Sequence, residues 1–175
     1  ETNPQEVMDL SPVAHLAAIE GKVPFINFFD GFRTSHEIQK IEKWDYADLK
    51  EMCNMDAVKA FREHALNPEH PAMRGSHENG DVFFQHREAC NSVYEALPAV
   101  VKKYMGKINE KLGTNYDLFN YYGAEDADRV IIAMGSICDV AEEVIDYLTA
   151  KGEKVGLIKV RLYRPWVSSA LLDVI

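Results

Sequence analysis

Six neighbouring side chains could act together in acid–base catalysis or in anion binding: Asp30, Arg33, Thr34, Ser35, His36 and Glu37. A carboxylate and an imidazole can exchange protons with a substrate. A guanidinium group can hold a carboxylate or a phosphate through two parallel hydrogen bonds. The alternative is structural: Asp30 and Ser35 cap the next helix, while Arg33 pairs with a carboxylate across a domain interface. The residue types alone leave both interpretations open.

The sequence argues against a metal site. His36-Glu37 begins like the H-E-x-x-H zinc motif, but the second histidine position is occupied by Lys40. Four further histidines lie within residues 64–86, together with Glu78 and Asp81: His64, His70, His77 and His86. Their spacing is wider than the two to five residues that separate paired ligands in closed zinc sites. Solvated loop histidines are therefore the favoured interpretation, and no metal ligand is predicted.

The stretch Gly135-Ser136-Ile137-Cys138 joins a predicted strand to a predicted helix. Backbone amides at such a helix N-terminus can receive a phosphate, but the dinucleotide fingerprint needs three spaced glycines and one is present. Cys138 could have a depressed pKa and be reactive, or it could be a small residue in a packed turn, which we favour. The three cysteines lack the close spacing of an iron–sulfur site or a disulfide framework, so we expect no cluster and a reducing compartment.

The elements that would position these groups indicate an α/β fold. A helix is expected from about Pro4 to Gly21, with Pro12 interrupting or restarting it. The apolar run Val23–Phe29 is typical of a strand covered on both faces, and it delivers Asp30 and its neighbours into a loop. Ser35 then resembles the N-cap of a short helix that contains Ile38 and Ile41.

The rest of the chain predicts short helices, one long helix and a βαβ unit. Short helices are expected at 45–52 and 56–64, followed by loop residues 67–71. Residues 87–112 predict a long amphipathic helix or a helix pair, because Pro98 disfavours an unbroken helix and Ser92 with Glu95 has capping-box spacing. Residues 116–122 predict a covering loop or an edge strand. The last third predicts a buried strand at 129–134, a helix at 138–150 and a parallel strand at 154–163.

Composition excludes several classes of partner. The chain has 175 residues and a net charge of -9. That charge argues against a nucleic-acid surface and against an anionic membrane. No apolar run approaches the roughly 20 residues of a membrane span, and no signal-peptide pattern is present, so we expect a cytoplasmic protein.

Three stretches together resemble one enzyme family. Residues 5–42 contain PFINFFDGFRTSHE, residues 73–89 contain MRGSHENGDVFFQHREA, and residues 126–166 contain the βαβ pattern. In this order they are similar to the thiamine-diphosphate-dependent pyruvate:ferredoxin (flavodoxin) oxidoreductases. Ser76-His77-Glu78 stands where the family usually has Thr-Ala-Gln, and Gly80 replaces a proline. The resemblance implies a fragment of a much longer enzyme.

The resemblance also implies the architecture. Residues 1–44 would close an incomplete parallel-sheet domain of the thiamine-diphosphate type, the part that binds the pyrimidine side of the cofactor. Residues 45–86 would be a connector, and residues 87–175 a helix plus part of a transketolase-C-terminal-like α/β domain.

The activity implied by the family is oxidative decarboxylation of pyruvate to acetyl-CoA and CO2, with electrons passed to ferredoxin or flavodoxin. The parent would contain thiamine diphosphate, Mg²⁺ and [4Fe–4S] clusters, would form a homodimer, and would use coenzyme A. We expect the fragment alone to be inactive, to carry no catalytic residue and to hold none of these cofactors. Asp30, Gly31, Arg33, His36 and Glu37 are expected to shape an interface with other domains near the active site. The alternatives are a related 2-oxoacid:ferredoxin oxidoreductase and a stand-alone, non-catalytic α/β interaction module.

Overall fold

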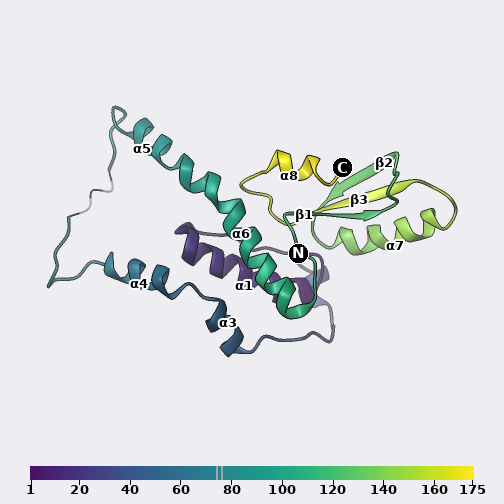
Figure 1. The fold of residues 1–175 in the computed structure, drawn as a ribbon, viewed down its shortest axis with the longest axis horizontal. Helices are drawn as coiled ribbons and strands as arrows, with labels where there is room; N and C mark the ends of the chain where they lie inside the picture. The colour runs from purple at the N-terminus through teal and green to yellow at the C-terminus, as the bar shows by residue number, and fades with distance from the viewer. Residues whose placement is uncertain (74, 76) are drawn as a thin grey trace.

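A computed structural model describes residues 1–73, 75 and 77–175, and it has a mixed α/β fold (Figure 1). A pair of long helices occupies the middle of the molecule, and a small sheet lies at one end. Three short helices and the segments that join them extend away from the sheet. In chain order the elements are α1 (Pro4–Gly21), α2 (Arg33–His36), α3 (Tyr46–Met52), α4 (Met55–Glu63), α5 (Phe83–Ala89), α6 (Asn91–Leu112), β1 (Phe119–Gly123), β2 (Arg129–Ala133), α7 (Ile137–Thr149), β3 (Val155–Val160) and α8 (Ser168–Leu172).

Helix α1 begins and ends with local signals that are present in the sequence. The Asn3 side chain caps its first turn by accepting a hydrogen bond from the Glu6 backbone amide at 3.0 Å. Lys22 follows the last helical residue in the left-handed conformation. Pro12 lies inside α1 and does not divide it, which differs from the expected interruption.

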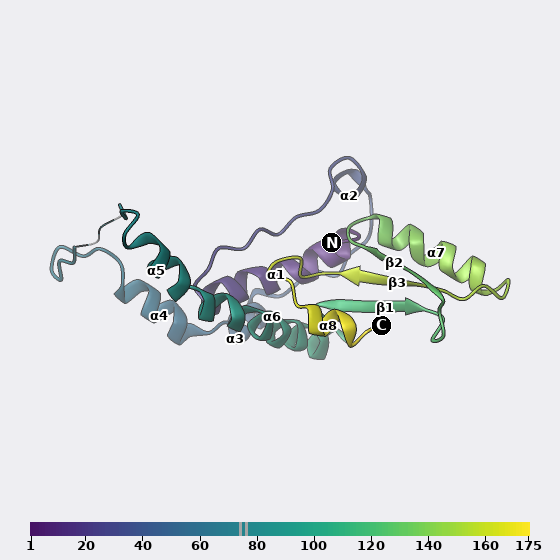
Figure 2. The same ribbon diagram turned by 90° about the horizontal axis from the view of Figure 1, so that it is seen from above.

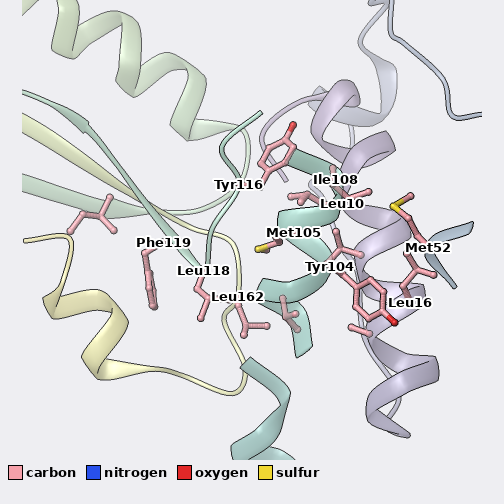
Figure 3. Close-up of a cluster of buried hydrophobic side chains, with 14 residues drawn as sticks. Leu10, Leu16, Met52, Tyr104, Met105, Ile108, Tyr116, Leu118, Phe119 and Leu162 are labelled. Atoms are coloured by element: carbon pink, nitrogen blue, oxygen red, sulfur yellow. The ribbon is translucent and has the colours of Figure 1, made fainter. Parts of the chain in front are cut away.

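The main hydrophobic core forms where α1 packs against α6 and where the two helices meet the chain around β1 and β3 (Figure 3). Tyr104 and Ile108 of α6 are fully buried, as is Ala17 of α1. Burial of such apolar side chains is the main stabilising term in folding. The buried members of the cluster are Leu10, Val13, Leu16, Ala17, Met52, Val101, Tyr104, Met105, Ile108, Tyr116, Leu118, Phe119, Ile158 and Leu162.

Helices α5 and α6 show that residues 87–112 form a helix pair with its break at Cys90, rather than one helix. Pro98 lies within α6 and the helix continues through it, so the expected disruption is wrong. Cys90 occupies the N-cap position of α6 without a side-chain capping bond, so Ser92 is not a cap. The buried stripe of α6 packs on α1, and this tertiary packing outweighs the local effect of the proline.

The sheet has the strand order β1-β3-β2. β2 and β3 are parallel and are joined through α7, which confirms the predicted βαβ unit. β1 pairs antiparallel to β3 as an edge strand, one of the two options for residues 116–122. α7 packs over β3 and β1. β2 was expected to be buried, but its first four residues are exposed.

Two expectations for the first 45 residues are wrong. Residues 23–29 belong to no strand of the described chain, because a strand exists only where a neighbour provides hydrogen bonds. Ile26 of this segment is 86% exposed. Residues 37–45 are not helical, so Ser35 caps no helix there and lies inside the short α2.

Residues 45–90 form an arm with short helices that confirm the two predicted between 45 and 64 (Figure 2). Asp45 and Asn54 cap α3 and α4 through their side chains. None of the side chains of α4 or α5 is buried. The connector resemblance also covers Arg74 and Ser76, which lie outside the described residues. Among the helices described, none has the length and apolarity needed to cross a bilayer.

Candidate functional site

The loop predicted to carry chemistry is built around Asp30 and Thr34. Asp30 Oδ1 accepts a hydrogen bond from Thr34 Oγ1 at 2.9 Å, and its Oδ2 lies 3.5 Å from the Thr34 backbone nitrogen. Thr34 is buried, although its neighbours are exposed. The hydrogen bond from Thr34, with a further one from Ser136, lowers the pKa of Asp30. Asp30 therefore stabilises the turn before α2, but it does not cap that helix as expected, because the N-cap residue is Phe32 and no side chain makes a capping bond.

The other predicted residues of the loop point to solvent. Gly31, Arg33, His36 and Glu37 are all exposed. The His36 ring stacks on Phe32, with ring centroids 5.8 Å apart, and its Nδ1 lies 2.9 Å from Ser35 Oγ. Over residues 1–73, 75 and 77–175, Arg33 forms no ion pair. The loop thus presents a cation, an imidazole and a carboxylate outward.

The loop lies beside the start of α7. Ser136, which hydrogen-bonds Asp30, is the last residue before this helix. Figure 2 shows α2 next to the N-terminal end of α7. Phe32, the N-cap residue of α2, adopts a φ of 60°, a conformation that L side chains rarely adopt and that often marks functional loops. The loop is thereby placed against the βαβ unit, which is far away in the sequence.

A cleft of about 1040 Å³ lies beside this contact. Its walls come from the first half of α1, from residues 23–30, from α6, and from residues 159–166 at the end of β3 and after it. Most of its lining side chains are apolar, including Leu10, Phe25 and Met105. Its charged lining groups include Glu6 and Arg161. The cleft therefore lies along the contact between α1 and the end of the sheet.

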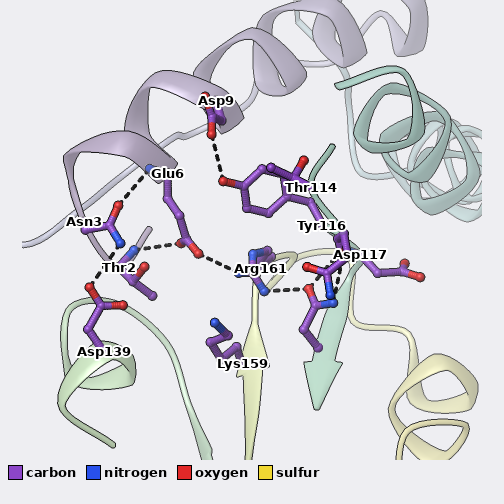
Figure 4. Close-up of polar contacts among 12 residues, drawn as sticks. Thr2, Asn3, Glu6, Asp9, Thr114, Tyr116, Asp117, Asp139, Lys159 and Arg161 are labelled. Carbon is purple, nitrogen blue, oxygen red and sulfur yellow. Dashed lines mark hydrogen bonds and ion pairs between the residues drawn. The ribbon is translucent and has the colours of Figure 1, made fainter. Parts of the chain in front are cut away.

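A buried ion pair joins α1 to the end of β3 (Figure 4). Arg161 Nη2 lies 2.5 Å from Glu6 Oε1, and both side chains are at least nine-tenths buried. Glu6 Oε2 also accepts a hydrogen bond from the Thr2 backbone amide at 3.0 Å, and Arg161 Nη1 donates to Asn120 Oδ1 at 2.6 Å. Burial acts to raise the pKa of Glu6, but Arg161 and the Thr2 hydrogen bonds outweigh it, and the net effect lowers the pKa.

Two more polar contacts lie between the start of α1 and residues that follow α6 in the chain. Tyr116 Oη donates to Asp9 Oδ2 at 2.8 Å, and Asp9 is 2% exposed. Burial of Tyr116, followed by its hydrogen bond to Asp9, raises the pKa of the phenol. Asn3, the cap of α1, donates to Asp139 of α7 at 3.1 Å. The start of α1 therefore makes two side-chain contacts with α7 and the end of β3, and a third with the segment that precedes β1.

Sequence reasoning did not identify Glu6, Asp9, Tyr116 or Arg161. Their partners are more than a hundred residues away in the chain, so no local spacing could pair them. One signal was available: Arg161 directly follows the apolar strand β3, where a charge needs a counter-charge if it is buried. Glu6 and Asp9 lie three residues apart, on one face of α1.

Cys138 is a packed structural residue. Its side chain is fully buried, and this burial raises the pKa of the thiol to about 11. The structure therefore contradicts the reactive alternative and agrees with the favoured one. Gly135 in the preceding turn has a φ of +84°, which glycine adopts without strain.

The described residues bring together no group of three or more His, Cys, Asp or Glu side chains that could hold a metal ion. The histidines of the arm make separate contacts: His86 Nδ1 lies 2.5 Å from Glu78, and His77 Nε2 lies 3.1 Å from Asn79. All three cysteines are free thiols.

Two family models and several known proteins that resemble this chain all belong to one enzyme family. Residues 1–106 match the family model described as "Pyruvate flavodoxin/ferredoxin oxidoreductase, thiamine diP-bdg", and residues 127–175 match "Pyruvate:ferredoxin oxidoreductase core domain II". A pyruvate-flavodoxin oxidoreductase of Enterobacter agglomerans is 60% identical over 95% of the chain. A pyruvate:ferredoxin oxidoreductase of Moorella thermoacetica is 54% identical over 98%. A pyruvate dehydrogenase [NADP(+)] of Cryptosporidium parvum is 50% identical over 96%. The chain spans 14%, 15% and 9% of the lengths of these three relatives.

Proposed function

The chain belongs to the pyruvate flavodoxin/ferredoxin oxidoreductase family, and we propose that it is part of an enzyme that oxidatively decarboxylates pyruvate to acetyl-CoA and CO2. The observation that carries this proposal is 60% identity over nearly the whole chain to a protein named for that activity. The two family models also match in succession along the chain. In this parent enzyme the electrons pass to ferredoxin or flavodoxin.

The choice of electron acceptor belongs to other parts of the parent. The three relatives share pyruvate in their names, but the acceptors named are flavodoxin, ferredoxin and NADP(+). Identity across this segment stays between 50% and 60% despite that difference. Residues 1–175 therefore support the pyruvate half of the reaction, and the flavodoxin or ferredoxin assignment follows from the two relatives of highest identity described above.

Thiamine diphosphate is the cofactor that the first family model names, and it supplies the electron sink for decarboxylation of a 2-oxoacid. Among the described residues, no group of three or more His, Cys, Asp or Glu side chains comes together, so we assign no metal centre built from protein side chains to this segment. The three separate cysteines likewise do not fit a [4Fe–4S] cluster. We assign thiamine diphosphate, Mg²⁺ and the iron–sulfur clusters to the parent, with their ligands outside the described residues.

The role of this segment is to hold two parts of the parent together. The Glu6–Arg161 pair joins α1 to the end of β3, the Asp9–Tyr116 hydrogen bond joins α1 to the segment before β1, and Asp30 links the loop to Ser136 beside α7. Arg33, His36 and Glu37 are left exposed on that loop. We propose that these three, with Asp30 and Gly31, contact other domains near the active site of a cytoplasmic, homodimeric parent.

The proposal is tested by an activity assay on the full-length parent. CO2 release should require both pyruvate and coenzyme A and should be accompanied by reduction of ferredoxin or flavodoxin. The same preparation is assayed with 2-oxoglutarate in place of pyruvate, and faster turnover of 2-oxoglutarate would contradict the choice of pyruvate. Calorimetric titration of residues 1–175 with thiamine diphosphate and Mg²⁺ should show no binding in the micromolar range. Heat of micromolar binding would contradict the placement of the ligands outside this segment.

A further inference from the structure

Residues 113–118 form the joint between the α1–α6 helix pair and the sheet. The joint lies between the two family-matched regions, which end at residue 106 and begin at residue 127. Gly113 ends α6 in the left-handed conformation, with a φ of 71°. Short connections of this kind are where hinges occur, because a few residues can absorb large changes in φ and ψ. The contacts of the joint therefore decide whether the two units move together or separately.

The Asn109 side chain holds the joint from the α6 side. Its Oδ1 accepts hydrogen bonds from Thr114 Oγ1 at 2.8 Å and from the Tyr116 backbone amide at 2.7 Å, and its Nδ2 donates to the Tyr116 carbonyl oxygen at 2.8 Å. A side-chain amide offers an acceptor and a donor together, which matches the carbonyl and amide of one residue. Asparagine is a weaker helix former than alanine or leucine, so these hydrogen bonds, and not helix propensity, explain its place in α6.

Asn120 of β1 holds the joint from the sheet side. Its Oδ1 accepts a hydrogen bond from the Asp117 backbone amide at 3.1 Å, and its Nδ2 donates to the Asn115 carbonyl oxygen at 2.8 Å. The same Oδ1 accepts from Arg161 Nη1 at 2.6 Å. Asn109 thus holds residues 114 and 116, and Asn120 holds residues 115 and 117. Each residue from 114 to 117 is bonded to a side-chain amide on one of the two units.

Tyr116 extends the effect of the joint to α1 and to the end of β3 (Figure 4). Its side chain is buried, its Oη donates to Asp9 Oδ2 at 2.8 Å, and its ring centroid lies 5.1 Å from the Arg161 guanidinium carbon. The Leu118 carbonyl oxygen accepts a hydrogen bond from the Arg161 backbone amide at 3.0 Å. Because Asn109 fixes the backbone of Tyr116, it also fixes where these contacts form.

We propose that Asn109 is a positioning residue that locks the joint, so that the α1–α6 helix pair and the sheet with α7 keep one relative orientation. The Glu6–Arg161 pair alone would not achieve this, because two units joined at one contact can still rotate about it. The φ and ψ angles of residues 114–117 can change only if hydrogen bonds to Asn109 or Asn120 break. The lock therefore removes the freedom that a hinge would need.

Hydrogen exchange on the full-length parent, measured by mass spectrometry of its peptides, tests the lock. Asn109→Leu removes all three hydrogen bonds, and Glu110→Leu makes a matched change at the exposed neighbour on α6. In N109L, the amides of residues 114–118 and of Arg161 should exchange on the order of tenfold faster than in E110L, because both groups lose fixed partners when the joint opens. The amides around Ile108 of α6 and Leu157 of β3 should keep their protection.

Three results would overturn the proposal. The first is unchanged exchange at residues 114–118. The second is faster exchange confined to that segment, because Asn109 would then stabilise its own turn only. The third is equal acceleration throughout α6 and β3, which would reduce the effect to global stability.

A second variant keeps the test decisive if N109L does not fold. Asn109→Asp keeps both acceptor contacts and loses only the donor to Tyr116, so its exchange rate at residues 114–118 should lie between those of E110L and N109L. An N109D rate equal to that of E110L would overturn the lock. Neither variant is judged by turnover, so a parent that acts on another 2-oxoacid would leave this inference unaffected.

Discussion

Arg161 Nη2 lies 2.5 Å from Glu6 Oε1, in a buried ion pair between residues that are 155 positions apart in the chain. The pair joins a helix within the first matched family region to a residue within the second. Asn120, on the first of the three strands, accepts a hydrogen bond from the same guanidinium. One side chain thus links α1, β1 and the end of β3.

Removal of one charge of this pair should destabilise the chain strongly. Glu6→Gln leaves Arg161 buried without its counter-charge, and breaking a buried pair in this way typically costs about 3–5 kcal/mol. The measurement is urea unfolding of residues 1–175, followed by circular dichroism at low protein concentration. Glu63→Gln is the control, because the Lys59–Glu63 pair is exposed and its atoms are 3.9 Å apart. An equal loss in both variants would contradict the role of the buried pair.

Loss of the Tyr116 hydroxyl should have a smaller effect. Tyr116→Phe leaves the buried Asp9 carboxylate without this donor, and an unsatisfied buried group costs about 1–3 kcal/mol. Tyr46→Phe removes a hydroxyl from a residue that is 87% exposed and should change the free energy of unfolding very little. The two variants are compared by urea unfolding, and a stable Y116F would show that Asp9 is satisfied in another way.

Acid should destabilise the chain through Glu20. Hydrogen bonds from Lys103 and then from Tyr104 lower the pKa of Glu20 from 4.5 to about 2, against the opposing effect of burial. Because the folded-state pKa is the lower one, the stabilisation is complete above pH 4.5 and is lost as the pH falls through about 2. Across this pH range, the thermal midpoint of the Glu20→Gln variant should fall less steeply than that of the unsubstituted chain. Identical slopes would contradict the assignment, with Glu95→Gln as the control.

The three thiols should react at different rates. Cys138 is buried and the pKa of its thiol is raised to about 11, whereas Cys53 and Cys90 are half-buried. At pH 8 a thiol reagent should modify two cysteines in the native chain and the third only on unfolding. Peptide mapping identifies the slow residue, and rapid labelling of Cys138 in the native state would show that the turn before α7 opens.

The exposed loop should matter for catalysis in the parent and little for folding. If Arg33 contacts another domain near the active site, Arg33→Ala should lower kcat/KM for pyruvate by on the order of tenfold through lost positioning. The thermal midpoint should stay unchanged, because Arg33 is exposed and forms no ion pair in the described chain. Lys40→Ala changes a nearby exposed cation and is the control; equal activity of the two variants would contradict the interface.

Much of the fold could be predicted because its signals are local. Pro4 and Gly21 mark the limits of α1, and two apolar runs on either side of a stretch with helical periodicity mark the βαβ unit from β2 to β3. The segment 23–29 shows the limit of such signals. Its composition is typical of a strand, but pairing requires a neighbouring strand, and no described residue provides one.

The candidate site was predictable in part. A structural role for Asp30 was one of the two interpretations, and its hydrogen bond with Thr34 is of that kind, although Asp30 is not the N-cap of α2. The buried network was not predictable, because Glu6 meets Arg161 only after α1 has packed on the sheet. The same applies to Pro98, whose local effect on α6 is overridden by packing against α1. The domain limits at 44 and 86 stay predictions.

The Glu6–Arg161 pair sets a condition for exchanging segments between relatives. The acid lies in the region that matches the first family model and the base lies in the region that matches the second, so a chimera joined between residues 106 and 127 inherits them from different parents. If one of the two contributing relatives lacks its charge, the chimera would contain a buried charged side chain without a counter-charge. A stable chimera therefore requires that both contributing relatives carry this ion pair, or that the two charged residues are replaced together.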